Sequence, residues 1–87
     1  MIVIKEILIE NYINSLSLND LKNYAKNNNI YLNEKDAKII LDMAKKYWKI
    51  VYKGNANEVF NLLKEKIDKR TYEKIIELYN LYKKEMN

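Results

Sequence analysis

Residues 17–41, SLNDLKNYAKNNNIYLNEKDAKIIL, hold two helix starts separated by a polar break, and this pattern decides the fold. Ser17 is followed three residues later by Asp20, the spacing of a capping box in which each side chain binds the other residue's backbone N–H. Asn33 precedes the sequence EKD in the same way. Helices are therefore expected on both sides of the KNNN break.

Helix caps also punctuate the rest of the chain, which has no proline and one glycine. Gly54 is expected to end a helix in the left-handed conformation. Asn55 opens the sequence NANE, in which Glu58 is placed to bind the backbone of the cap. Asp68 or Thr71 is placed to start the last helix. Caps at these intervals predict several short helices rather than strands and turns.

Apolar residues recur at steps of three and four between the caps, which is the helical period. The predicted helices span residues 2–15, 18–28, 34–52, 56–67 and 70–85. The residues expected to face the core are Ile4, Ile7, Leu8 and Tyr12; Leu18, Leu21 and Ala25; Ala37, Ile40, Leu41, Ala44, Trp48 and Val51; Val59, Leu62, Leu63 and Ile67; and Tyr72, Ile75, Ile76, Tyr79 and Tyr82. The fold class is all-α, a compact bundle of four to five short helices in a single domain, residues 1–87. The alternative is that MIVIK and WKIVYK pair as two short strands.

Composition gives little basis for assigning a partner. Asn, Ile, Lys and Tyr, which are numerous here, have AT-rich codons, so a genome low in G and C raises their number whatever the function. The net charge is +4 with both signs interspersed, which permits a polyanionic partner without indicating one. No apolar run exceeds four residues, far below the ~20 that span a bilayer. A cytoplasmic protein with no membrane partner is expected.

The residue inventory argues against most enzyme classes. The chain has no His and no Cys, and so lacks the commonest general base, thiol nucleophiles and the usual transition-metal ligands. One glycine is too few for a phosphate-binding loop or a dinucleotide fingerprint. Carboxylates such as Glu73 and Glu77 share a helix face with lysines and are expected to form a solvated surface. We expect a non-enzymatic protein with no cofactor and no metal.

The segment KKYWKIVYK, which starts at Lys45, is the candidate nucleic-acid-binding site. On a helix Lys45, Lys49 and Lys53 align at steps of four, with Trp48 and Tyr52 on an adjacent face, and cations beside flat rings suit phosphates and bases. The alternative is that the lysines complement the C-terminal end of a helix dipole while Trp48 continues the core stripe. A second basic group, of Lys64, Lys66, Lys69 and Arg70, is expected at the corner between the last two helices. The candidate nucleic-acid-binding residues are therefore Lys45, Lys49, Tyr52, Lys53, Lys64, Lys69 and Arg70.

Some apolar residues lie outside the stripes of core-facing residues assigned to each predicted helix: Ile2, Ile9, Ile39, Leu78 and Leu81. Either they form an exposed patch that binds a partner or a second copy, or the helix phases differ and these residues belong to the core. Surplus apolar surface and the lack of catalytic groups favour a protein–protein interaction module, an adaptor or regulator. A nucleic-acid-binding protein is the alternative.

A family resemblance is based on residues 13–40, INSLSLNDLKNYAKNNNIYLNEKDAKII. It extends to the KGNANE link, Leu62–Leu63 and the helix start at residues 68–71. Over nearly the whole chain these features resemble the YqfT-like family of small uncharacterised proteins from Gram-positive bacteria. The resemblance implies a compact helical fold and carries over no activity, cofactor or site residue. The lysine-rich KKYWKIVYK departs from the family pattern. A shorter likeness, over residues 21–46, is to the helix–extended link–helix hairpin of SAP- and LEM-type modules, which bind nucleic acid or small protein partners.

Overall fold

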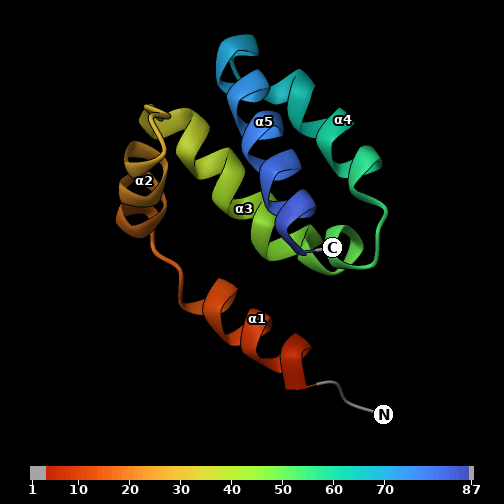
Figure 1. Cartoon of the computed structure of the whole chain (residues 1–87). Helices are drawn as coiled ribbons and strands as arrows, with labels where there is room; N and C mark the ends of the chain where they lie inside the picture. The colour runs from red at the N-terminus through yellow and green to blue at the C-terminus, as the bar shows by residue number, and fades with distance from the viewer. Residues whose placement is uncertain (1–3, 87) are drawn as a thin grey trace.

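The computed structural model describes residues 4–86, apart from the side chains of Tyr82, Glu85 and Met86, and every regular element in this range is a helix (Figure 1). The five helices are α1 (Ile4–Ser15), α2 (Leu18–Asn27), α3 (Glu34–Tyr52), α4 (Ala56–Lys66) and α5 (Lys69–Met86). Within the described range their bounds agree with the predicted ones within one residue, while residues 2–3 of the first predicted helix lie outside that range. The all-α fold is confirmed. The two-strand alternative is wrong where it can be judged, because residues 4–5 and 48–52 are helical, while residues 1–3 lie outside the described range.

Three of the predicted caps start helices as expected. The Ser17 hydroxyl accepts a hydrogen bond from the Asp20 N–H, and the Asp20 carboxylate accepts one from the Ser17 N–H, both at 3.1 Å. The Asn33 side-chain oxygen accepts from the Asp36 N–H at 2.7 Å, and Asp68 accepts from the N–H of Thr71 at 3.3 Å. These bonds satisfy N–H groups that the first turn of a helix leaves free.

The prediction that Asn55 caps α4 is wrong, because its side chain makes no cap hydrogen bond. Asn55 instead completes the end of α3: its N–H donates to the Ile50 carbonyl at 3.0 Å, while the Gly54 N–H donates to Val51 at 3.1 Å. Gly54 has a φ of +100°, the left-handed conformation predicted for it. This pair of bonds is the Schellman motif.

A second Schellman motif ends α2, and the sequence analysis did not predict it. Asn29 has a φ of +62°, its N–H donates to Lys26 at 3.0 Å, and the Ile30 N–H donates to Ala25 at 2.8 Å. Asparagine tolerates the left-handed region better than other residues with a Cβ. Ala25 and Ile30 are both buried, as the apolar contact that accompanies this motif requires.

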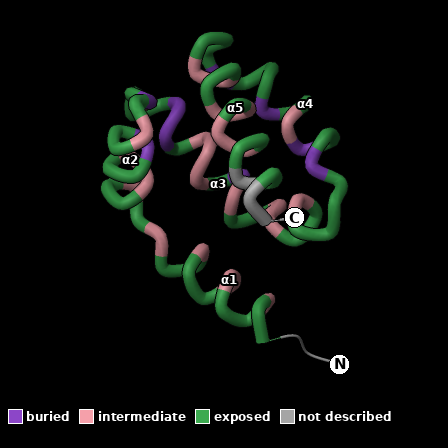
Figure 2. Tube along the Cα trace, viewed as in Figure 1, coloured by how far each residue is buried: buried purple, intermediate pink, exposed green. Residues whose placement is uncertain are grey.

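The core lies between α3, α4 and α5. Met43, Val59, Leu63 and Ile67 are buried there, with half-buried residues from α3, α4 and α5 packed around them. α3 and α4 form an antiparallel hairpin with the most extensive contact in the chain, and α5 lies beside α4 (Figure 1). Figure 2 shows the buried positions concentrated on this hairpin and on the junction of α2 with α3.

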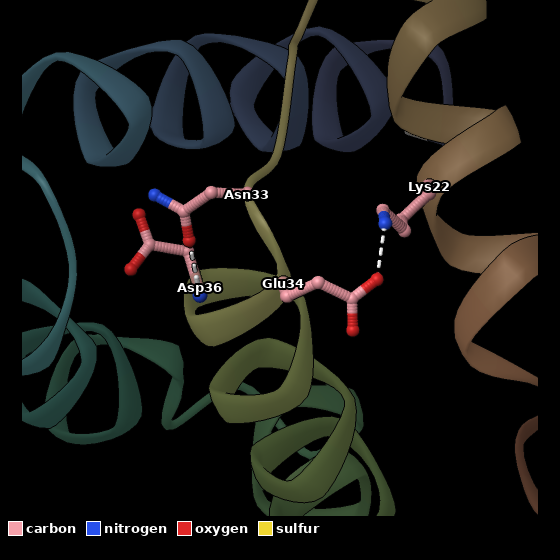
Figure 3. A network of polar contacts seen from close by, with 4 residues as sticks. All are labelled: Lys22, Asn33, Glu34 and Asp36. Atoms are coloured by element: carbon pink, nitrogen blue, oxygen red, sulfur yellow. Dashed lines mark hydrogen bonds and ion pairs between the residues drawn. The ribbon is translucent and has the colours of Figure 1, made fainter.

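The α2–α3 junction is held by apolar burial and by one exposed ion pair (Figure 3). Ala25, Ile30 and Ala37 are buried at this end of the molecule. The Lys22 ammonium donates to the Glu34 carboxylate at 2.5 Å across the junction. This hydrogen bond and the Lys22 charge, with a smaller contribution from the charge of Lys38 and against a small opposing effect of desolvation, hold the pKa of Glu34 below its ordinary value.

Helix α1 lies apart from the other helices and touches α3 along one edge (Figure 1). None of its residues is buried. The prediction that Ile4, Ile7, Leu8 and Tyr12 face the core is wrong: their exposed fractions are 75%, 42%, 63% and 58%. The half-buried face instead carries Ile9 and Ile13, because α1 has apolar residues on both sides and its phase was assigned to the wrong one.

Among the remaining predicted core residues with described side chains, only Leu62 is exposed; the others are buried or half-buried. The off-stripe residues divide differently. Ile9, Ile39 and Leu78 are half-buried, Leu81 is 61% exposed, and Ile2 lies outside the described range. Of the off-stripe residues that the structure describes, only Leu81 is therefore exposed, while other exposed apolar side chains lie on α1.

Candidate partner-binding groove

An apolar groove of about 640 Å³ lies between α1 and the body formed by α3, α4 and α5. One wall is the face of α1 that carries Ile9 and Ile13. The floor is the face of α3 that runs from Ile40 to Tyr52. The opposite side consists of apolar residues of α4 and α5: Val59, Phe60, Leu63, Ile75 and Tyr79. The groove therefore reaches the core itself, because Met43, Val59 and Leu63 belong to both.

Helix α1 does not close the groove, because its contact with the other helices is limited to α3. Ile9 and Ile13 face the body but remain half-buried, and α1 meets only the edge of α3. Two residues, Leu16 and Ser17, separate α1 from α2. A helix with apolar residues on two sides is ordinarily covered on both of them. In this chain the outer face of α1 has no covering element among the described residues.

Aromatic rings form much of the groove's lining. Trp48 and Tyr52 meet edge to face with centroids 6.4 Å apart, and Phe60 and Tyr79 do so at 4.9 Å. The second pair ties α4 to α5, since its rings come from both helices. Trp48 is half-buried and lines the groove, so it is neither a core residue nor a free surface ring. Edge-to-face pairs of this kind add to the stability that burial supplies.

The lysines of the predicted site stand beside this lining. Lys45, Lys49 and Lys53 are all exposed on the side of α3 that faces away from the core. The Lys49 ammonium lies 5.7 Å from the centroid of the Trp48 ring, and that of Lys46 lies 5.3 Å from the Tyr47 ring. Tyr52 is 37% exposed, but its ring lines the groove. The structure thus separates the residues of KKYWKIVYK into aromatic groove residues and a lysine rim.

The second basic group is at a different place on the molecule. Lys64, Lys69 and Arg70 are exposed near the corner between α4 and α5. Figure 1 shows this corner at the opposite end of α4 from the turn that joins α3 to α4, and Lys53 directly follows α3 in sequence. The structure therefore does not bring Lys69 and Arg70 together with Lys49 and Lys53 into one patch.

Several groove residues were absent from the predicted core. Met43, Tyr47 and Phe60 were not assigned, although Ile40, Met43, Tyr47 and Val51 follow one another at steps of three and four. This stripe was visible in the sequence beside the one that contains Ala37, Leu41 and Trp48. A wide apolar face on α3 is what allows one helix to serve both the core and the groove.

The described residues also line a second cleft, of about 950 Å³, between the end of α2 and α5. They contain no group of three or more acidic side chains arranged to hold a metal ion, His and Cys being absent from the chain. None of the described helices is long and apolar enough to cross a membrane.

Comparison with known proteins gives a family but no activity. No curated protein and no solved structure matches this chain. Residues 1–83 match a family described as a protein of unknown function, DUF2624. That match covers all five helices except the last residues of α5, and with them the whole groove. The chain belongs to the DUF2624 family of proteins of unknown function.

Proposed function

We propose that this protein is a non-enzymatic interaction module, an adaptor or regulator of the cytoplasm, that binds a protein partner in the groove beside α1. One observation carries the proposal: a helix that is apolar on both sides has no buried residue, and it borders an open groove floored by core residues. Exposed apolar surface of this kind marks interaction sites. The absence of His and Cys from the sequence supports a role without catalysis. The narrower kinship with YqfT-like proteins of Gram-positive bacteria is part of the same proposal.

The dimensions of the groove favour a helical segment as its occupant. Its floor on α3 runs from Ile40 to Tyr52, a distance of about 18 Å at 1.5 Å per residue. About three turns of a second helix have the same length. Recognition of an amphipathic helix in an apolar groove uses side chains at steps of three and four as anchors. The aromatic and aliphatic lining supplies the complementary surface.

Photo-crosslinking tests this proposal in cells. A benzophenone amino acid replaces Tyr52, which lines the groove, or Leu62, which is 42% exposed on α4 and does not line it. The proposal expects a discrete crosslinked protein from the Tyr52 position and a much weaker one from the Leu62 position. Equal crosslinking from both positions, or none from either, contradicts a partner in the groove. A crosslink between two copies identifies self-association as the mode of binding.

Nucleic-acid binding is the second candidate, and the exposed line of Lys45, Lys49 and Lys53 favours it. Two features weaken it: the exposed Asp42 interrupts the same face of α3, and Tyr52 and Trp48 turn to the groove rather than to this face. A titration with mixed-sequence DNA and RNA at two salt concentrations decides the matter. Binding that falls steeply with salt and is lost when the three lysines become Glu establishes the second candidate. Absence of such binding leaves the groove as the site.

A further inference from the structure

The charges at the groove are all of one sign among its lining residues. Lys5 on α1 and Lys83 on α5 line it, and no Asp or Glu does. Two more ammonium groups, of Lys46 and Lys49, lie over rings of Tyr47 and Trp48, which are part of the lining. The groove is therefore an apolar trough with cations contributed by α1, α3 and α5.

We infer that the segment bound in this groove is an acidic amphipathic helix, with apolar anchors on one face and Asp or Glu along its edges. This inference rests on the proposed function and names the chemistry of its partner. Complementary charges at the rim of an interface raise the association rate and reject partners of the wrong sign. Because the lysines come from three helices around the trough, several carboxylates are needed to meet them, and a ligand with a single anionic group would meet only one.

A second copy of the chain fits this groove less well. The chain carries a net charge of +4, and the exposed lysines of α3 outnumber Asp42 on the same face in every copy, so two rims brought together repel. The helix most available for exchange between copies is α1, which has two acidic residues, Glu6 and Glu10, against one basic residue, Lys5. Its excess of one negative charge is small against the three lysines that α3 and α5 contribute, Lys46, Lys49 and Lys83. An acidic helix from a different protein matches the rim better.

The full chain can be tested with three fluorescently labelled helical peptides in a polarisation assay. The first has Leu at i, i+3, i+4 and i+7 flanked by Glu, the second replaces each Glu by Lys, and the third keeps Glu but replaces each Leu by Ser. The inference expects the first peptide to bind about tenfold or more tightly than the second, with an affinity that falls as salt rises. The third peptide should not bind, because it has no anchors for the apolar trough.

Charge reversal on the protein supplies the matched control. The variant Lys49→Glu/Lys83→Glu should bind the acidic peptide about tenfold less tightly and the lysine peptide more tightly than the unmodified chain. The variant Lys64→Glu/Lys69→Glu changes the net charge by the same amount at exposed positions that do not line the groove, and it should leave both affinities unchanged. Circular dichroism of each variant verifies the fold.

The outcomes separate the inference from the proposed function. Equal binding of the acidic and lysine peptides, or equal effects of the two protein variants, overturns the acidic partner but leaves an apolar groove that binds helices. Failure of all peptides together with a persistent crosslink from Tyr52 also overturns the acidic partner while the proposed function stands. Dimerisation in sedimentation equilibrium that blocks peptide binding overturns the inference in favour of a second copy. Failure of peptides and crosslinking together removes the proposed function as well.

Discussion

Helix α1 and the α3–α4 hairpin contain apolar residues in similar proportion, about half of each, yet only the hairpin buries them. In α3 the apolar residues occupy one broad face, with Met43 buried and lysines on the other side. In α1 they are divided between an outer side, with Ile4, Leu8 and Tyr12, and an inner side, with Ile9 and Ile13. Burial is decided by the angular distribution of apolar residues rather than by their number.

The difference indicates where stability and binding reside. The hairpin covers part of its apolar face with α5 and buries a core there, whereas α1 has two apolar faces and one neighbour. A helix that needs a neighbour on each side is stabilised fully only when something else supplies the second. We therefore expect the hairpin to control unfolding and α1 to respond to binding.

The largest effect should come from truncating one leucine in each region. Leu63 is 5% exposed in the core, and Leu63→Ala should lower the free energy of unfolding by about 2–4 kcal/mol through lost burial and a residual cavity. Leu8 is 63% exposed on α1, and Leu8→Ala should change that free energy by less than about 0.5 kcal/mol. Urea titration followed by circular dichroism measures both.

The same pair of variants can contradict this comparison between α1 and the hairpin. A loss for Leu8→Ala as large as that for Leu63→Ala would mean that the outer face of α1 is covered in solution. Repeating the titration over a range of protein concentrations then distinguishes the causes, because burial in a dimer makes the midpoint depend on concentration.

The helices themselves were predictable because their determinants are local. Ser17, Asn33 and Asp68 sit at helix starts in a chain with no proline, and one glycine ends the longest helix. Asn55 was misassigned because a residue directly after a left-handed glycine belongs to the end of the preceding helix, and its N–H is already bonded there. Asn29 was missed because three successive asparagines leave open which of them adopts positive φ.

The groove was not predictable, because it depends on how helices pack. The sequence showed which residues of KKYWKIVYK are cationic and which are aromatic, but not that the rings turn toward α1 while the lysines stay outside. In α1 both sides carry apolar residues, so the periodicity of the sequence alone could not show which side faces the other helices. Lys83 lies far from Lys49 in sequence, and only the packing of α5 brings it to the groove.

A smaller effect should distinguish the two asparagines that precede the helices of the hairpin. Asn33 accepts a hydrogen bond from the Asp36 N–H, so Asn33→Ala should cost about 1 kcal/mol of stability. Asn55 makes no side-chain cap bond, so Asn55→Ala should cost no more than a few tenths of that amount. Thermal and urea unfolding of the two variants gives the comparison. Equal losses would mean that Asn55 caps α4 in solution after all.

The smallest effect should come from the ion pair between Lys22 and Glu34, which joins α2 to the start of the hairpin (Figure 3). Because the folded-state pKa of Glu34 is lowered, the pair stabilises the fold at pH values above the unfolded-state pKa. That contribution is lost as the pH falls through the lower folded-state value. Glu34→Gln should therefore lower the unfolding midpoint slightly at neutral pH and low salt, and not at all at acid pH, where both states are protonated.

Two measurements verify that assignment. Carboxyl NMR titration should show the pKa of Glu34 rising in Lys22→Ala, since that variant removes the hydrogen bond and the charge that lower it. Glu65→Gln, at an exposed position of α4 with no ion pair to the described residues, removes the same charge as a control. If the two Gln variants shift the midpoint equally, net charge rather than the α2–α3 pair is responsible. The orientation of α2 on the hairpin would then rest on apolar burial at Ala25, Ile30 and Ala37 and on the hydrogen bond that the Lys74 ammonium donates to the Asn29 carbonyl at 3.3 Å.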